Sequence, residues 1–315
     1  MYYVAHRLFA AHDRLLAARL ADRIAVKTGQ QNVFLPFCDT DEEDLVAEVK
    51  GRRLYELDSE RLRALTGMVA ILHGPSLDDG VCMEIGYAYA LGVPVTVVTT
   101  DFQTYSLGAE KARFDFPDPL VEAAATSVIR VARLAPPTPG SVAGTRFTAF
   151  ADRNEHQLDW ALDAAVEELL GHPGPSMQAP PDPAPQARTA FVEPSPYSPD
   201  PDALLAAAVE SGFTVHTTTR FTATDPHVAA AQDLAHARSA SHLVADVSGP
   251  ETPPGAAVLI GAAAARGTAV AAYQPRATFT HAAGREPNWR NLMIQYAATA
   301  HPDTPDALAA WLRSW

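Results

Sequence analysis

The chain has 315 residues, of which 47% are hydrophobic and 19% charged, a composition typical of a globular protein with room for two domains. Its formal net charge is −13 and its pI is about 5.2, which argues against nucleic-acid or anionic-membrane binding through a broad basic face. No apolar run reaches membrane-spanning length, and residues 1–7 lack the features of a secretion signal. With only Cys38 and Cys82, we expect no disulfide scaffold and a reducing, cytoplasmic location.

The first hundred residues alternate short apolar runs with helical patterns. Strands are predicted at residues 2–5, 32–36, 68–72 and 95–98, and helices at 8–25, 41–49, 54–65 and 83–91. Short aliphatic runs bounded by turn residues are typical of buried parallel strands. Strand, helix and strand in succession form βαβ units, whose ligands bind at the carboxyl ends of the strands.

The pattern changes after residue 105. Residues 113–116 are interpreted as a loop or short edge element, 128–132 as a last strand, and 154–170 as an amphipathic helix. A proline-rich segment at 171–186 indicates a linker with a domain boundary near residue 180. We therefore divide the chain into a first domain at 1–170, a linker at 171–188 and a second domain at 189–315.

The second half repeats the first. A shift of 175 positions (233 − 58) carries Asp58 onto Asp233 without a gap, and the same shift superposes the following glycines: Gly80 on Gly255, Gly86 on Gly261, and Gly92 on Gly267. The repeat fails at the acidic positions, because Glu84 becomes Leu259 and Asp78 becomes Pro253. The second copy is therefore interpreted as degenerate.

The acidic loop of the first copy is the strongest candidate site. Asp78 and Asp79 follow the predicted strand 68–72, and Glu84 opens the next helix among apolar neighbours. Such carboxylates can simply cap a helix and complement its dipole. A carboxylate held among apolar groups beside other carboxylates is also typical of a catalytic site.

The run from Asp78 to Pro94, with Gly80, Met83-Glu84-Ile85-Gly86-Tyr87 and Gly92 in fixed places, resembles the nucleoside 2-deoxyribosyltransferase family. The segments 2–9, 33–36 and 100–102 resemble that family's first strand and loop, its second strand, and the end of its fourth strand. The resemblance covers residues 2–105. It implies two tandem doubly wound (flavodoxin- or Rossmann-like) parallel-sheet α/β domains that form a pseudo-dimer.

The resemblance also implies catalytic roles. Glu84 matches the family's nucleophile, which attacks C1′ of the sugar as in glycoside chemistry by carboxylates. Tyr3 matches the tyrosine that orients this glutamate, with ordinary strand packing as the alternative. Asp58 matches the carboxylate that contacts and protonates the base, with a surface helical aspartate as the alternative. Asp79 is interpreted as a turn residue.

Further residues are expected to bind the substrate. Asp78 matches the family's ligand of a sugar hydroxyl, and Gly80 stands in the same motif. Phe9 and Phe37 are candidates to flank the base, although aromatic residues at strand ends are more often core. In the second half, Asn291-Leu292-Met293 resembles the family's C-terminal segment, whose asparagine holds the sugar 5′-hydroxyl of a neighbouring subunit. We expect Asn291 and Met293 to complete the first domain's site within one chain.

Two departures from the family leave the substrate open. His6-Arg7 stands where the family usually has Gly-Pro, so Arg7 either binds a substrate phosphate or points outward. Phe37-Cys38-Asp39 replaces the common glutamine and arginine, which indicates an unusual base specificity. The sequence predicts a deoxyribosyltransferase or an N-glycoside hydrolase, with a 5′-monophosphate N-glycosidase or a non-catalytic nucleotide-binding module as alternatives.

No cofactor is expected, and no metal-ligand spacing stands out among the histidines. The expected partners are a small nucleoside or nucleotide and a free base, with no nucleic acid and no membrane. Because two fused copies can pair internally, we expect a monomer or a simple homodimer.

Overall fold

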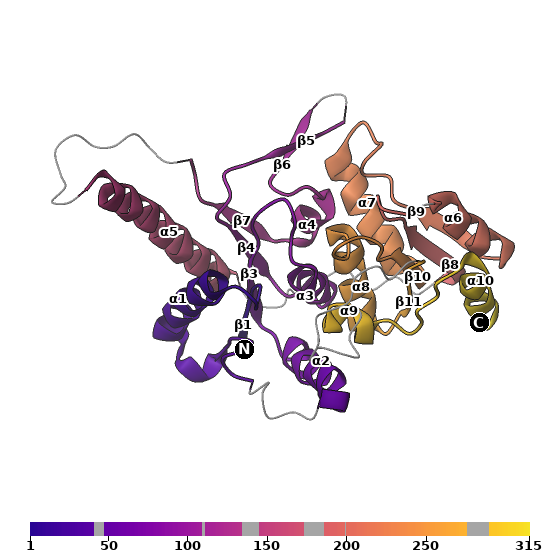
Figure 1. The fold of residues 1–315 in the computed structure, drawn as a ribbon, viewed down its shortest axis with the longest axis horizontal. Helices are drawn as coiled ribbons and strands as arrows, with labels where there is room; N and C mark the ends of the chain where they lie inside the picture. The colour runs from indigo at the N-terminus through magenta and orange to yellow at the C-terminus, as the bar shows by residue number, and fades with distance from the viewer. Residues whose placement is uncertain (41–46, 109–110, 134–144, 173–185, 199, 276–289) are drawn as a thin grey trace.

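The computed structural model describes residues 1–40, 47–108, 111–133, 145–172, 186–198, 200–275 and 290–315 (Figure 1). They form two α/β domains with their helices packed between and outside two parallel sheets. Among these residues, we find no helix with the length and apolar character that crossing a membrane requires.

The first domain is built on a five-stranded sheet in the order β2-β1-β3-β4-β7, with every neighbouring pair parallel. Its strands are β1 (Tyr2–Ala5), β2 (Val33–Phe34), β3 (Gly67–Ile71), β4 (Val95–Thr99) and β7 (Ser127–Arg130). A short antiparallel hairpin, β5 (Tyr105–Leu107) and β6 (Ala112–Phe114), follows β4. Strands β3 and β4 are buried throughout, as their aliphatic sequences predict.

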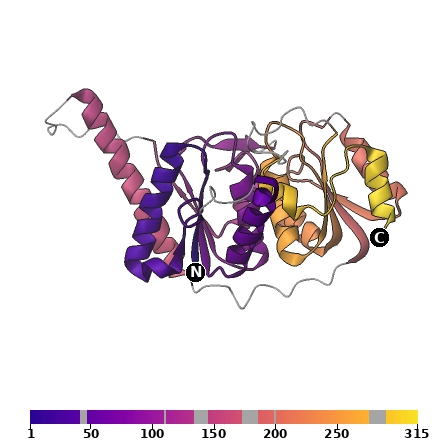
Figure 2. The ribbon, with the colours of Figure 1, turned by 60° about the horizontal axis from the view of Figure 1, so that its bottom comes forward.

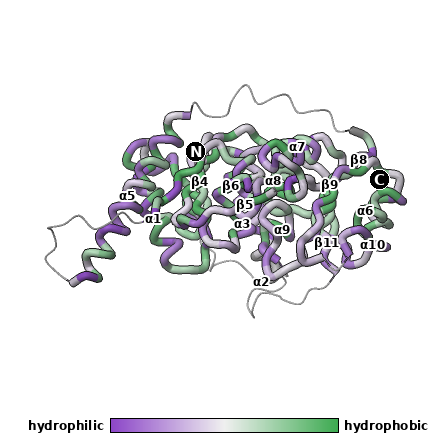
Figure 3. Tube along the Cα trace, turned by 90° about the horizontal axis from the view of Figure 1, so that it is seen from above, coloured by the Kyte–Doolittle hydropathy of each residue, from purple (hydrophilic) through white to green (hydrophobic). Residues whose placement is uncertain are grey.

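Helices cover both faces of this sheet. The outer face is covered by α1 (Ala11–Thr28) and α5 (Arg146–Gly171), and the inner face by α2 (Ala47–Arg63), α3 (Asp79–Ala90) and α4 (Pro119–Ala124). A short 3₁₀ turn, η1 (Gln30–Asn32), connects α1 to β2. One end of α5 projects beyond the body of the domain (Figure 2), and hydrophilic and hydrophobic segments alternate along it (Figure 3).

The second domain has a four-stranded parallel sheet in the order β11-β10-β8-β9. Its strands are β8 (Gln186–Glu193), β9 (Thr214–Thr217), β10 (Ala240–Asp246) and β11 (Ala269–Tyr273). Its outer helices are α6 (Pro201–Glu210) and α10 (Pro305–Arg313), and its inner helices are α7 (Pro226–Ser239), α8 (Pro254–Arg266) and α9 (Leu292–Ala297).

The two sheets share one winding order. If the strands are numbered from the start of each domain, both sheets contain the order 2-1-3-4. In the second domain, Ala271 forms an isolated parallel bridge with Ala300, at the position that the fifth strand β7 takes in the first domain. The prediction of two doubly wound parallel-sheet domains is therefore confirmed.

The predicted elements differ from the observed ones mainly at their ends. Helix α3 begins at Asp79 rather than residue 83, because the Asp78 carboxylate caps it by accepting a hydrogen bond from the Val81 amide. Helix α5 begins at Arg146 rather than residue 154, with Thr145 as its cap. Residues 113–114 belong to the hairpin strand β6.

Two predicted boundaries fall partly on undescribed residues. The predicted helix start at 41–46 and most of the predicted linker, residues 173–185, lie outside the described part of the chain. Strand β8 begins at Gln186, three residues before the predicted start of the second domain at 189.

Helices α3 and α8, which correspond under the 175-residue shift, pack directly against each other at the domain interface. A Cβ atom at Gly86 would lie 1.9 Å from the Val258 carbonyl oxygen, and a Cβ at Gly261 would lie 1.9 Å from the Met83 carbonyl oxygen. The two contacts are related by the same shift, so the helices cross about a local pseudo-twofold axis. Backbone-to-backbone contact of this kind requires glycine on both helices.

Substituting Gly86→Ala should lower the free energy of unfolding by about 3 kcal/mol, because the new methyl group collides with backbone rather than with a flexible side chain. Urea denaturation followed by circular dichroism measures the change. The matched control is Gly171→Ala at the end of α5, where a Cβ meets no atom within 4 Å. Equal stability of the two variants would contradict the proposed close contact.

Candidate active site

Tyr3 and Glu84 form the centre of the candidate site. The Tyr3 hydroxyl donates a hydrogen bond of 2.6 Å to Glu84 Oε1, and both residues are buried. Tyr3 comes from β1, whose alternation turns its side chain to the inner face of the sheet, and Glu84 comes from α3 on that face. The Tyr3 ring packs against Phe34 at a centroid distance of 5.3 Å, which holds the hydroxyl in place.

The environment of Glu84 favours its neutral form. Burial raises the pKa of the Glu84 carboxyl well above its usual range, and the negative charges of Asp58 and Asp78 raise it further. The hydrogen bond from Tyr3 acts in the opposite direction and lowers this pKa. Tyr3 is thus the group that stabilises the ionised carboxylate, the form that a nucleophile needs.

Asp78 lies at the start of α3, where one of its carboxylate oxygens caps the helix. Its Oδ1 accepts a 2.9 Å hydrogen bond from the Val81 amide. Burial and the neighbouring Asp79 raise the pKa of Asp78 to about 7. Near neutral pH this carboxyl is therefore present in both protonation states, so it can accept a hydrogen bond from a hydroxyl or donate one to it.

The second domain contributes directly to this cluster. Asp79 is 6% exposed and accepts a 3.1 Å hydrogen bond from the Thr252 amide. It also accepts a hydrogen bond from the Asn291 side chain, an interaction that lowers the pKa of Asp79 against the raising effect of burial. The Asn291 Nδ2 atom lies 2.7 Å from the position a Cβ would take at Gly80. The structure thus brings Asn291 of the second domain to residues 78–80 of the first.

Asn291 is held in this position by its own helix. It caps α9, because its Oδ1 accepts a 3.0 Å hydrogen bond from the Met293 amide, which leaves its Nδ2 facing α3. Met293 is 4% exposed and packs in the core shared by the two domains. The structure therefore gives Met293 a packing environment, and its contact with substrate remains a prediction.

Asp58 lies on α2, where its charge raises the pKa of Glu84. Three further predicted residues lie at more exposed positions. The Arg7 side chain is 46% exposed, and its guanidinium lies 3.9 Å from Glu251 Oε1 of the second domain. Phe9 and Phe37 are 54% and 45% exposed, and Phe37 has a positive φ of 65° with the Arg14 guanidinium 5.6 Å from its ring. Their predicted contacts with the base or a phosphate remain predictions.

Asp79 is the residue of this site that the sequence interpretation missed. The sequence favours a turn residue at this position, whereas the structure places Asp79 in the first turn of α3 and in contact with Thr252 and Asn291. The available signal is its position between Asp78 and Gly80, inside the motif that resembles the family. Its partners lie more than 170 residues away in sequence, so the spacing gave no indication of them.

The corresponding place in the second domain is filled by an arginine. Arg220 is 0% exposed, and it pairs with Glu193 at 2.5 Å, Asp118 at 2.7 Å and Asp233 at 3.4 Å. A Cβ at Gly255, the counterpart of Gly80, would lie 2.2 Å from Arg220 Nη2. The second domain therefore presents a closed ion-pair network where the first presents its carboxylates.

Comparison with known protein families finds a match in the first domain. A family model described as nucleoside 2-deoxyribosyltransferase matches residues 2–128. This part of the chain belongs to that family. The segment contains the Tyr3–Glu84 pair and Asp78, whereas Asn291 lies outside it.

A solved structure, a conserved protein from Enterococcus faecalis V583, is 32% identical over 35% of this chain and 67% of its own. Its TM-score is 0.29, so the likeness is one of sequence. No curated protein matches the chain.

Proposed function

We propose that the chain cleaves the N-glycosidic bond of a nucleoside through Glu84 and transfers the sugar to a second base. The observation that carries the proposal is the buried 2.6 Å hydrogen bond between Tyr3 and Glu84, inside the segment that matches the family model. A carboxylate oriented by a hydroxyl and surrounded by other carboxyl groups suits attack on a sugar carbon that develops positive charge.

The proposed reaction has two displacements. In the first, a Glu84 oxygen bonds to C1′ while the bond from C1′ to the base nitrogen breaks, and Asp58 supplies the proton that the leaving base takes. In the second, a nitrogen of the acceptor base attacks C1′, the glycosyl ester breaks, and the acceptor returns its proton to Asp58. Attack by water instead of a base yields free sugar, which makes transfer and hydrolysis two outcomes of one intermediate.

The second domain is proposed to complete this site as a degenerate copy of the first. The equal strand order, the paired contacts of Gly86 and Gly261, and the position of Asn291 beside Gly80 support this interpretation. Asn291 then holds the sugar hydroxyl from within the same chain, and no partner subunit is needed. The domains assigned are 1–170 and 189–315 with the linker 171–188 between them.

A nucleoside fits this environment better than a nucleoside 5′-monophosphate. Arg7 already faces Glu251, and the acidic residues Asp78, Asp79 and Glu84 lie in the same cluster. A phosphate dianion would meet this negative charge, and Arg7, the cation expected to bind it, is shared with another carboxylate. We therefore rank the monophosphate glycosidase below the nucleoside enzyme.

The first experiment is a chromatographic time course with 2′-deoxynucleosides, ribonucleosides and their 5′-monophosphates, each with and without a second base. We expect a new deoxynucleoside only when acceptor base is present. Glu84→Gln should lower turnover at least about a thousandfold, because the amide removes the nucleophile while keeping its size.

The variant Glu168→Gln, on the exposed side of α5, is the matched control and should retain full turnover. Release of free base without an acceptor would assign hydrolysis instead of transfer. Binding of a nucleoside without any turnover by the wild-type protein would contradict the enzymatic proposal and favour a binding module.

Tyr3→Phe should shift the acidic limb of the pH profile of kcat/KM to higher pH. The hydrogen bond from Tyr3 lowers the pKa of Glu84, so its loss raises that pKa and the carboxylate ionises only at higher pH. Tyr2→Phe is the control, because Tyr2 packs on the outer face of the same strand. An unshifted limb in Tyr3→Phe would mean that another group controls the profile.

Asn291→Ser should reduce kcat/KM about tenfold, the expected loss of one hydrogen bond to the sugar. Serine keeps a capping oxygen for α9, so the helix start is preserved. The same variant should show no such loss with a 2′,5′-dideoxynucleoside, which lacks the 5′-hydroxyl. Equal losses on both substrates would show that Asn291 acts on the fold of the site and not on that hydroxyl.

A further inference from the structure

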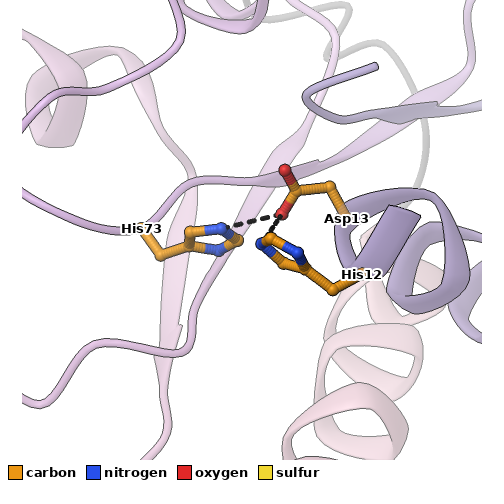
Figure 4. Close-up of side chains that lie close together, drawn as sticks. All are labelled: His12, Asp13 and His73. Carbon is orange, nitrogen blue, oxygen red and sulfur yellow. Dashed lines mark hydrogen bonds and ion pairs between the residues drawn. The ribbon is translucent and has the colours of Figure 1, made fainter. Parts of the chain in front are cut away.

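His12, Asp13 and His73 meet on the outer face of the first domain. His12 and Asp13 lie in the first turn of α1, and His73 follows β3 sixty residues later in the chain. Figure 4 shows the two imidazole rings converging on one carboxylate oxygen. The Tyr3–Glu84 pair lies on the other side of the sheet, with the inner helices, so this cluster belongs to a different site.

The spacing of the three side chains suits one metal ion. Asp13 Oδ1 lies 3.0 Å from His73 Nε2 and 3.4 Å from His12 Nε2, and the three donor atoms are all within 4.8 Å of one another. Ligand atoms of a tetrahedral zinc ion, with bonds of roughly 2.0–2.1 Å, are about 3.3 Å apart. A zinc ion therefore needs only small side-chain rotations to enter between them.

Burial supplies a second, independent observation. Asp13 is 1% exposed, and its Oδ2 atom has no hydrogen-bond partner among the described residues. The Nδ1 atom of His73 is also buried, with no partner found in the same part of the chain. Buried polar atoms are nearly always satisfied, and these two are not, whereas both imidazoles contact the other carboxylate oxygen, Asp13 Oδ1. The Asp13 carboxylate therefore keeps acceptor capacity that a bound cation would use.

A cavity of about 490 Å³ adjoins the cluster. It is lined by all three residues together with Arg19, Thr100 and Asn154, at the carboxyl ends of β3 and β4. Three protein ligands leave one position of a tetrahedral ion open, as in zinc sites that bind water or a small ligand. The cavity beside the three side chains offers space for such a fourth ligand.

We propose that His12, Asp13 and His73 bind one zinc ion whose fourth ligand, water or a small anion, occupies the adjoining cavity. Two imidazole nitrogens and one carboxylate oxygen are the donor set that zinc accepts, whereas calcium and magnesium require mostly oxygen ligands. The ion connects the start of α1 to the end of β3. It plays no part in the Glu84 chemistry.

The test is isothermal titration calorimetry of the chelator-treated full chain with zinc sulfate, followed by cobalt(II) substitution. We expect one zinc per chain, a higher melting temperature with zinc, and the visible absorption of four-coordinate cobalt. His12→Ala and His73→Ala should each weaken zinc binding at least tenfold. His12 is the safest variant for folding, because its side chain is 80% exposed.

The matched control is His172→Ala, which removes a histidine paired with the single carboxylate of Glu168 at 3.1 Å. It should leave both stoichiometry and affinity unchanged. Asp13→Asn, checked for folding by circular dichroism, should remove the zinc-dependent rise in melting temperature. Zinc binding that persists unchanged in His12→Ala and His73→Ala, or fails to reach one ion per chain in the wild type, would overturn the proposal.

Discussion

The backbone contact between α3 and α8 determines how closely the two domains approach each other. Because Gly86 and Gly261 have no side chain, a carbonyl oxygen of the opposite helix lies where the Cβ atom of any other residue would be. This approach buries the inner faces of both sheets in one core and brings the starts of α3 and α9 together. Asp79 therefore meets Thr252 and Asn291 across the domain interface. A looser crossing would separate these groups and leave the carboxylates of the first domain without their partners.

The two halves manage buried charge in opposite ways. The first domain holds Asp78, Asp79 and Glu84 close together with their pKa values raised by burial, a costly arrangement typical of sites that bind or transform a ligand. The second domain neutralises its carboxylates with the buried Arg220, whose charge is satisfied by hydrogen bonds on every side. The first arrangement thus keeps raised pKa values in a cluster of carboxyl groups, whereas the second neutralises its carboxylates by ion pairing with one arginine.

Sequence patterns predict the features of the fold that depend on neighbouring residues and on the internal repeat. The succession of strands and helices in the first domain follows from the hydrophobic runs, and the two parallel-sheet α/β domains follow from the repeat together with the family resemblance. The sequence did not predict the Arg220–Asp118 pair or the His12–Asp13–His73 cluster, because their members are 102 and 60 residues apart and only the folded chain joins them. Helix starts were misjudged wherever a capping side chain, such as Asp78 or Thr145, extended the helix beyond its apolar stripe.

Asp118 and Asn291 occupy matching places, each at the start of a short helix and each reaching the glycine of the opposite half. In a dimer of identical chains, any residue at this place would appear in both sites, so one could not be an acid while the other is an amide. Joining the halves in one polypeptide removes that restriction. Each half can then change without altering its counterpart, so one chain can carry an acid at one of the two matching places and an amide at the other.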